Sequence, residues 1–207
     1  MKIVQVGEPV LREPARELSR VQILDTSIQA LIELMRDTVR DAPGVGLAAT
    51  QVGEPLQLAV IEDRAEYHKT LTEAEMRERG RSEIPFHVIV NPVLELLAEP
   101  TEIFFEGCLS LPGFTALVPR AKEVRVHCLD HRGEPRTIEA SGWYARILQH
   151  EIDHLRGTLY IDRMQVRSFS TLENYTRYGK GRQLDAAAKS EPLSELANRQ
   201  NDLSEVS

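Results

Sequence analysis

Two stretches of the chain carry apolar residues at the three- and four-residue spacing of an amphipathic helix. The first covers residues 26–40 and ends before an Ala-Pro-Gly stretch, and the second covers residues 142–156, between Ser141 and Gly157. The apolar positions are Ile28, Leu31, Ile32, Met35 and Val39 in the first stretch and Ile147, Leu148, Ile152 and Leu155 in the second. The pattern therefore predicts two helices that each bury one face.

Between these helices the pattern changes to short apolar or alternating runs, which predict β-strands. The runs cover residues 56–61, 87–92, 93–100, 102–112, 123–130 and 135–141, and prolines 92, 100 and 112 punctuate them. Residues 130–133 (Asp-His-Arg-Gly) predict a hairpin turn, and Cys128 alternates with Val124 and Val126 on the predicted inner face. We expect an α+β fold in which mostly antiparallel strands surround a central helix over residues 142–156.

Two segments fall outside this regular pattern. Residues 62–83 are heavily charged and predict a solvated, expendable insertion with a short helix at 72–79. The chain becomes polar towards its end and predicts frayed helix or disorder from about residue 185. We therefore expect one domain of ordinary size that is followed by a polar C-terminal tail.

Composition and charge narrow the functional classes. The 207 residues carry a net charge of -7, which disfavours a nucleic-acid surface because phosphate binding needs clustered Lys and Arg. No apolar run is long enough for a membrane span, and no signal or transit peptide is evident at the start. We expect a cytoplasmic protein with no membrane contact, and organellar origin after processing stays open. The two cysteines favour a ligand or core role over a disulfide.

The second predicted helix contains the stretch His150-Glu151-Ile152-Asp153-His154. Residues i and i+4 of a helix have Cβ atoms about 5–6 Å apart, so both histidines can direct a ring nitrogen at one metal ion. Glu151 lies beside the first histidine, where its carboxylate can act on a water molecule. The alternative is a helix with two surface histidines at chance spacing.

A catalytic metal site usually has three protein ligands, so a third one is required. Cys108 is the best candidate, because it lies in Glu106-Gly107-Cys108-Leu109-Ser110, where Gly107 permits an unusual backbone conformation. The alternative, a small buried hydrophobic residue, is the commoner fate of a free cysteine.

The glycine-rich stretch 44–51 (Gly-Val-Gly-Leu-Ala-Ala-Thr-Gln) is the third element. Its small residues let a peptide backbone approach closely, and the amide of Gln51 can donate to a developing negative charge. A tight loop before a strand is the alternative. A nucleotide site is disfavoured because the stretch lacks the spacing and the lysine of a phosphate loop.

Taken together, GVGLAATQ, EGCLS and QHEIDH occur in the order and at about the separations seen in peptide deformylases, and the sequence resembles that family. The resemblance extends through LREPA, LVPRA and HLRGTLYIDR, so it covers about residues 1–170. It implies a catalytic domain over residues 1–170 and a C-terminal extension over residues 171–207. The stretch ASGWYARILQHEIDH with LYIDRM resembles the branch that includes mitochondrial and plastid deformylases and some bacterial ones.

The resemblance implies removal of the formyl group from the N-terminal formylmethionine of new polypeptides. It assigns Cys108, His150 and His154 as ligands of one divalent ion, Fe(II) first, with Zn, Ni or Co as alternatives. It implies that Glu151 transfers the proton and that the Gln51 amide and the backbone N–H of Leu109 stabilise the oxyanion. The implied partners are formylmethionyl peptides on nascent chains, with a transient ribosome contact.

The resemblance also implies a pocket for the methionine side chain. For Trp143 and Arg146 the alternative is helix packing alone, with the Arg head group reaching water. Both side chains are larger or more polar than the aliphatic residues of many bacterial members. The loop 111–115 lacks the arginine that some bacterial members use along the substrate backbone. The residues assigned to substrate binding are Val45, Gly46, Gly107, Trp143, Arg146 and Ile147.

Residues outside these motifs have smaller expected roles. Arg120 and Asp153 form a candidate pair that would orient the metal-bearing helix, and a solvated Asp153 is the alternative. The remaining histidines lack partners at ligand spacing and are interpreted as surface or strand residues: His68, His87, His127 and His131.

Two other functions are compatible with parts of the pattern. A zinc endopeptidase shares the helix motif, but such enzymes usually take their third ligand from His or a carboxylate rather than from a cysteine. A non-catalytic metal-binding or ribosome-associated protein is the second rival, against which the intact Glu151 and Gln51 count.

Overall fold

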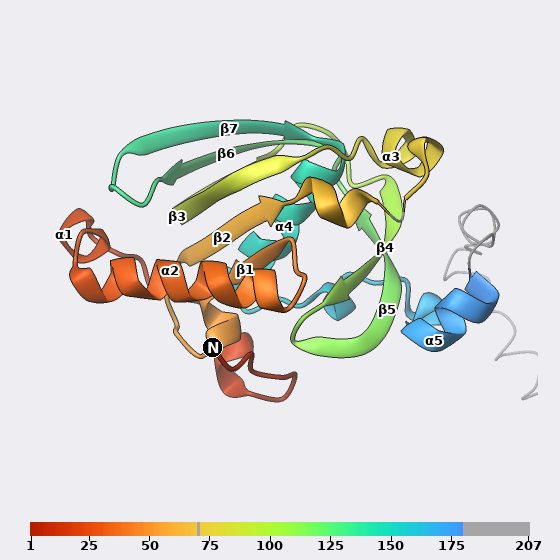
Figure 1. The fold of residues 1–207 in the computed structure, drawn as a ribbon, viewed down its shortest axis with the longest axis horizontal. Coiled ribbons are helices and arrows are strands. Elements are labelled where there is room, and N and C mark those ends of the chain that lie inside the picture. The colour runs from red at the N-terminus through yellow and green to blue at the C-terminus, as the bar shows by residue number, and fades with distance from the viewer. Residues whose placement is uncertain (70, 180–207) are drawn as a thin grey trace, which may run out of the picture.

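A computed structural model describes residues 1–69 and 71–179. Its larger sheet has five antiparallel strands in the order β1-β2-β3-β6-β7. This sheet forms the upper part of the molecule in Figure 1. The strands are β1 (Gly46–Ala48), β2 (Leu58–Asp63), β3 (Ile84–Leu96), β6 (Glu123–Leu129) and β7 (Pro135–Ser141).

A smaller sheet completes the β-structure. It has the order β4-β5-β8, again antiparallel, and consists of β4 (Glu102–Cys108), β5 (Leu111–Arg120) and the short β8 (Ser170–Thr171). The β4–β5 register shifts between Glu106 and Cys108, which places a bulge where the strand approaches its end.

The helix α4 (Gly142–Leu155) crosses the centre of the molecule (Figure 1). Its apolar side, with Ile147, Leu148, Ile152 and Leu155, packs in one core cluster with strand residues of the larger sheet. The helix α2 (Thr26–Asp41) covers β1 and β2 through a second cluster that includes Met35 and Val39. Both helices have the predicted bounds to within one residue, so the hydrophobic periodicity was a sound guide.

The other helices are short. They are α1 (Arg20–Ile23), α3 (Glu73–Arg79), α5 (Leu172–Asn174), the 3-10 turns Pro9–Leu11, Ala49–Val52, Ala65–His68, Tyr160–Asp162 and Val166–Ser168, and a π-helical turn at Tyr175–Gly179. Thr72 caps α3 by accepting from the Glu75 amide, so the predicted short helix at 72–79 is confirmed. Across residues 1–69 and 71–179, no helix is both long and apolar enough to span a membrane.

The prediction of separate strands before and after Pro92 is wrong, because β3 runs through it. Asn91 adopts a left-handed conformation (φ 49°), and the β3–β6 register shifts between Val90 and Val93. The Asn91 side chain accepts from the Leu18 amide and donates to the Leu18 carbonyl, at 2.9 and 2.8 Å. A bulge fixed by these bonds lets β3 continue through Pro92, which has no backbone N–H to donate to the neighbouring strand.

The interpretation of residues 62–83 as a solvated insertion is wrong at both ends. Asp63 is 0% exposed and accepts two bonds from Arg81, from Nε at 2.7 Å and from Nη2 at 2.8 Å. The turn after α3 also packs on α4, because a Cβ on Gly142 would lie 2.8 Å from the Arg79 carbonyl oxygen. The charges in this segment therefore include a buried ion pair beside the central helix.

Two further expectations concern Cys128 and the extension. Cys128 lies on β6 and is buried, as predicted. The division at residue 170 stays a prediction. Residues 171–179 follow the smaller sheet as β8, α5 and the π-helical turn, and the segment for which we predicted disorder lies outside the described residues.

Candidate active site

One end of α4 brings three polar side chains together. His150 and His154 lie one turn apart with ring centroids 5.0 Å from each other, and Glu151 is 3% exposed. The helix is anchored by apolar contacts on its other side, so these groups are fixed on a buried and rigid element.

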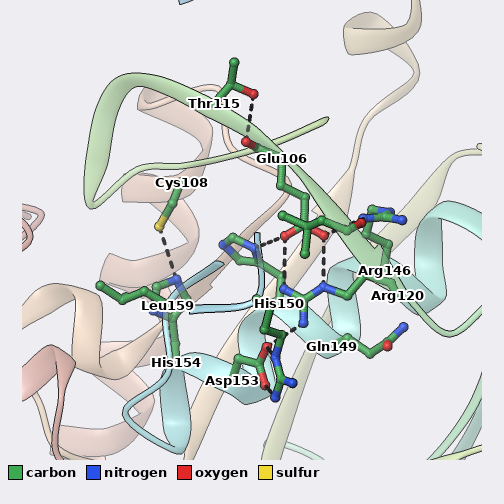
Figure 2. A network of polar contacts seen from close by, with 12 residues as sticks. Glu106, Cys108, Thr115, Arg120, Arg146, Gln149, His150, Asp153, His154 and Leu159 are labelled. Carbon is green, nitrogen blue, oxygen red and sulfur yellow. Dashed lines mark hydrogen bonds and ion pairs between the residues drawn. The ribbon is translucent and has the colours of Figure 1, made fainter. Parts of the chain in front are cut away.

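The end of β4 brings Cys108 to the two histidines. Its Sγ lies 3.2 Å from Nε2 of His154, and one ligand atom from each of the three residues lies within 4.8 Å of the others. Figure 2 shows the sulfur directed at His154. The Ser110 amide and the Gln51 side-chain amide each lie 3.4 Å from the same sulfur. These contacts fix the position of the sulfur, and a cysteine binds metals through its sulfur as the thiolate.

Glu106 is the centre of a buried ionic network that the sequence interpretation missed (Figure 2). Its carboxylate accepts from Arg120 at 2.9 and 3.0 Å, from Nη1 of Arg146 at 2.7 Å and from Nδ1 of His150 at 3.0 Å. Burial alone would raise the pKa of Glu106, but the Arg120 guanidinium and the His150 hydrogen bond outweigh it and hold this pKa far below its ordinary value.

The bond to Glu106 determines how His150 can act. A carboxylate can only accept, so the shared proton resides on Nδ1 and the lone pair is left on Nε2. A histidine held in this way is oriented and made more basic as a metal ligand. The sequence signal for Glu106 was available, because this glutamate follows the apolar run Ile-Phe-Phe and directly precedes Gly107 and Cys108.

The predicted pair of Arg120 and Asp153 is confirmed. Nη1 of Arg120 donates to Asp153, and Arg163 donates to the same carboxylate at 2.6 and 2.7 Å. Asp153 is buried, so the alternative of a solvated side chain is wrong. The network thus ties the metal-motif helix to β5 and to the turn after Tyr160–Asp162.

Glu151 lies against the glycine-rich loop. A Cβ on Gly46 would be 2.3 Å from Oε1 of Glu151, so only glycine fits at this position. Burial raises the pKa of Glu151 to about 7. Its Oε2 is buried and has no hydrogen-bond partner among residues 1–69 and 71–179, which leaves it available to a water or a substrate group.

Gln51 is also buried at the site. Its Oε1 accepts from the Ala48 amide at 2.9 Å, and its Nε2 is directed towards Cys108 and Ser110. Fixing the oxygen in this way leaves the amide N–H groups as the donors that face the cluster. Leu109, which follows Cys108 directly, lines the same cleft.

A cleft of about 460 Å³ opens onto this cluster. Gly107 lies at the register shift between Glu106 and Cys108, so the expected irregular backbone occurs there as a bulge, with a φ outside the left-handed region. The cleft is lined by all of the residues assigned to substrate binding, Val45, Gly46, Gly107, Trp143, Arg146 and Ile147, and by Gln51, Cys108, Leu109, His150 and Glu151.

Arg146 does not reach water. It is 3% exposed and donates to Glu106 and to the carbonyl oxygens of Glu102 and Val118. Its guanidinium also lies over the ring of Trp143, 5.9 Å from the centroid. The expected alternative of a solvated head group is therefore wrong, because the charge of Glu106 holds the guanidinium inside.

The other histidines lie away from the cluster. His68 is beside Asp63, and Nε2 of His87 lies 2.9 Å from the Tyr144 hydroxyl. His127 is on β6 and His131 is in the turn before β7. The interpretation as surface or strand residues is confirmed for His87, His127 and His131. It is wrong for His68, which lies in a 3-10 turn and whose side chain is only 14% exposed beside the buried Asp63.

The donor set fits a divalent metal ion. A thiol sulfur and two imidazole nitrogens converge. Within the described part of the chain the neighbouring Oε2 of Glu151 has no hydrogen-bond partner, so a water molecule can bind it. Three protein ligands with room for water are the make-up of a catalytic site, whereas a structural site is closed by a fourth ligand. The fold and the site together have the make-up of a mononuclear metallohydrolase.

Comparison with known proteins names the family. The family model described as polypeptide deformylase matches residues 1–169. The chain is 48% identical over 172 residues to a chloroplastic peptide deformylase 1A of Solanum lycopersicum. This match covers 83% of this chain but only 62% of that relative. This protein belongs to the polypeptide deformylase family.

Solved structures agree. A peptide deformylase of Synechococcus elongatus in complex with actinonin matches with a TM-score of 0.67 and 35% identity, over 86% of both chains. A deformylase of Acinetobacter baumannii with Met-Ala-Ser bound matches with a TM-score of 0.68 and 31% identity, over 79% of this chain and 98% of that one. The similarity to plant organellar and bacterial members confirms the predicted resemblance and the mixed, mostly antiparallel fold.

Proposed function

We propose that this protein removes the formyl group from the N-terminal formylmethionine of newly made polypeptides, giving formate and a free amine. Family membership supports the proposal, and one observation carries it in this chain. The residues that the structure describes leave the buried Oε2 of Glu151 without a partner, next to the convergent Cys108, His150 and His154. A base without a partner next to a metal-type donor set is what hydrolysis of an amide by water requires.

A divalent ion held by Cys108, His150 and His154 would supply an acidified water and a Lewis acid for the formyl oxygen. Glu151 takes the proton from the attacking water, whose oxygen forms a bond to the formyl carbon. The same carboxylic acid then gives its proton to the methionine nitrogen as the carbon–nitrogen bond breaks, and formate leaves. A pKa near 7 suits a group that must accept and return one proton.

Negative charge develops on the formyl oxygen during attack. The side-chain amide of Gln51, fixed by its bond to the Ala48 amide, donates to that oxygen together with the backbone N–H of Leu109. Because these donors are oriented before substrate arrives, they need little rearrangement during the reaction.

The methionine side chain occupies the part of the cleft lined by Val45, Trp143, Arg146 and Ile147. Ile147 and Trp143 supply apolar surface, and Arg146 presents its alkyl portion because its guanidinium is engaged by Glu106. Gly46 and Gly107 let the peptide backbone approach. The bound Met-Ala-Ser is a property of the Acinetobacter relative and supports this assignment by analogy.

We propose Fe(II) as the ion, with Zn, Ni or Co as functional substitutes, since thiolate and imidazole ligands suit several of these metals. The proposed partners are formylmethionyl peptides on nascent chains and, transiently, the ribosome. The proposed compartment is the cytoplasm or the interior of an organelle that uses formylmethionine. Elemental analysis of protein purified anaerobically and ribosome co-sedimentation test the first two of these proposals.

The decisive experiment measures formate released from formyl-Met-Ala-Ser by protein loaded anaerobically with Fe(II) or with Ni(II). The acetylated peptide is the control, and peptide products are analysed for internal cleavage. Rapid turnover of the formyl peptide alone supports the proposal. Internal cleavage would favour an endopeptidase, and no turnover by metal-loaded protein would favour a binding role.

Two variants test the roles. Glu151→Ala should retain its metal and lose about 10²–10⁴-fold in kcat, because it removes the general base. Near-normal formate release by the metal-loaded variant would refute that role. Cys108→Ser should weaken metal binding, and an unchanged affinity would exclude Cys108 as a ligand.

A further inference from the structure

The mouth of the cleft carries an apolar ledge that includes one residue beyond the segment matched by the family model. We define the ledge as three residues, which are Phe114 of β5, Phe169 just before β8, and Leu172 at the start of α5. These side chains are 40%, 43% and 47% exposed, whereas Ile147 deeper in the cleft is 3% exposed. Leu172 and Phe114 line the same cleft as Cys108 and Glu151. The family match ends at residue 169, so Leu172 lies just beyond the matched segment.

The ledge is fixed in place on both sides of Leu172. Before it, β8 pairs with β5 through Phe114 opposite Thr171, and the rings of Phe114 and Phe169 stack with centroids 5.2 Å apart and planes 6° apart. After it, the Tyr175 ring lies 4.3 Å from that of Phe105, another cleft-lining residue. In Figure 1, α5 lies beside β5 at the edge of the smaller sheet.

Local hydrogen bonds orient α5. The Thr171 hydroxyl caps this helix by accepting from the Asn174 amide at 3.2 Å. Just before β8, the Ser168 hydroxyl accepts from the Leu117 amide at 2.8 Å, which ties the segment to the middle of β5. Leu172 is thus held at the mouth of the cleft by contacts that do not involve its own side chain.

The position of the ledge relative to the reacting groups suggests its occupant. A peptide whose formyl group is at Cys108 and Glu151 and whose methionine lies against α4 must leave the cleft through its mouth. An exposed apolar surface that continues an active-site cleft is a usual place for substrate contact.

We propose that Leu172, with Phe114 and Phe169, contacts the side chains that follow the formylmethionine and sets a preference for apolar residues there. This inference rests on the proposed function. Leu172 acts as a specificity-determining residue, because its contact adds to binding of longer peptides without touching the scissile bond.

The first test compares Leu172→Ala with Val166→Ala, a matched aliphatic control that is 74% exposed and does not line the cleft. KM and kcat are measured on formyl-Met-Gly-Gly and formyl-Met-Leu-Leu. We expect Leu172→Ala to raise KM about fivefold for the leucine peptide only, from loss of apolar contact, with kcat unchanged. Equal effects on both peptides, or none on either, would overturn the proposal.

The second test gives a gain of preference that a merely structural role would not produce. Leu172→Glu should favour formyl-Met-Lys-Lys over formyl-Met-Glu-Glu in kcat/KM by about threefold or more relative to wild type, and Leu172→Lys should reverse it. Both shifts should shrink at high salt. The absence of reciprocal shifts would overturn the ledge. Failure of wild-type protein to deformylate formyl-Met-Gly-Gly would instead overturn the proposed function.

Discussion

Replacing Glu106 by Gln tests whether the buried network controls the metal site. The change keeps the shape of the side chain but removes the charge that faces Arg120 and Arg146, and it turns one acceptor into a donor. The side-chain amide N–H₂ group would then face other N–H donors, and the remaining oxygen cannot serve both arginines and Nδ1 of His150.

The expected loss of stability follows from what each partner keeps. Removing one member of a buried ion pair costs about 3–5 kcal/mol. Arg120 keeps its bond to Asp153, and Arg146 keeps two backbone carbonyl oxygens. We therefore expect the free energy of unfolding of the metal-free protein to fall by about 3 kcal/mol, the lower end of that range.

The effect on metal binding is separate. Loss of the acceptor for Nδ1–H of His150 should weaken the metal about 10–100-fold, as for other partners of metal-ligating histidines. Urea unfolding of the metal-free protein measures the first effect, and competition dialysis with Zn(II) measures the second. Glu95→Gln is the control, since this exposed carboxylate near the end of β3 pairs with Arg125 of β6. A metal affinity of Glu106→Gln within twofold of wild type would refute the reasoning.

Three further changes test other parts of the structure. Gly46→Ala should lower kcat about 10²-fold or more with the metal retained, since its Cβ displaces the Glu151 carboxylate, and normal formate release would contradict the 2.3 Å approach. Burial raises the pKa of the Cys128 thiol to about 11, so it should react with iodoacetamide at pH 8 about 100-fold more slowly in native than in urea-unfolded protein. A ratio of the two rates below ten, measured by mass spectrometry, would contradict this. Hydrogen bonds from Arg40 lower the pKa of Glu62 below 4.5, so Glu62→Gln should reduce the free energy of unfolding by about 1 kcal/mol at pH 7. This difference should shrink as the pH falls below 4.5, and a pH-independent difference in urea midpoints would count against the ion pair.

The stability sign for Glu62 follows from the direction of its pKa shift. A carboxyl group whose pKa is lower in the folded protein stabilises the fold while it is ionised. That stabilisation is complete above the unfolded value of 4.5 and is lost as the pH falls through the lowered folded value. Protonation then removes the charge that Arg40 binds.

Local order accounts for what the sequence predicted well. The periodicity of 26–40 and 142–156 predicted α2 and α4, because each residue in a helix has a fixed angular position relative to its neighbours. The same rule placed His150 and His154 on one face. The hydrophobic alternation likewise placed Cys128 inside β6.

Sequence reasoning was weaker where neighbours come from distant parts of the chain. Glu106 and His150 are 44 positions apart, and only the packing of β4 on α4 brings them together. A strand through Pro92 was excluded by the usual rule for proline, yet the bulge and the bonds from Asn91 to Leu18 make it possible. The sequence pattern could not identify Glu106 as the partner of His150, or Leu18 as the partner of Asn91 beside Pro92.

The sequence by itself determined the two long helices, the histidine spacing and, through three joined motifs, the family. The tertiary structure decided that Arg146 and Asp63 are buried, that Glu106 orients His150, and that Leu172 lines the cleft. The physical reason is that helix and strand periodicities are set by bonds between near neighbours. The burial of a charge depends instead on an opposite charge that only the folded chain places beside it.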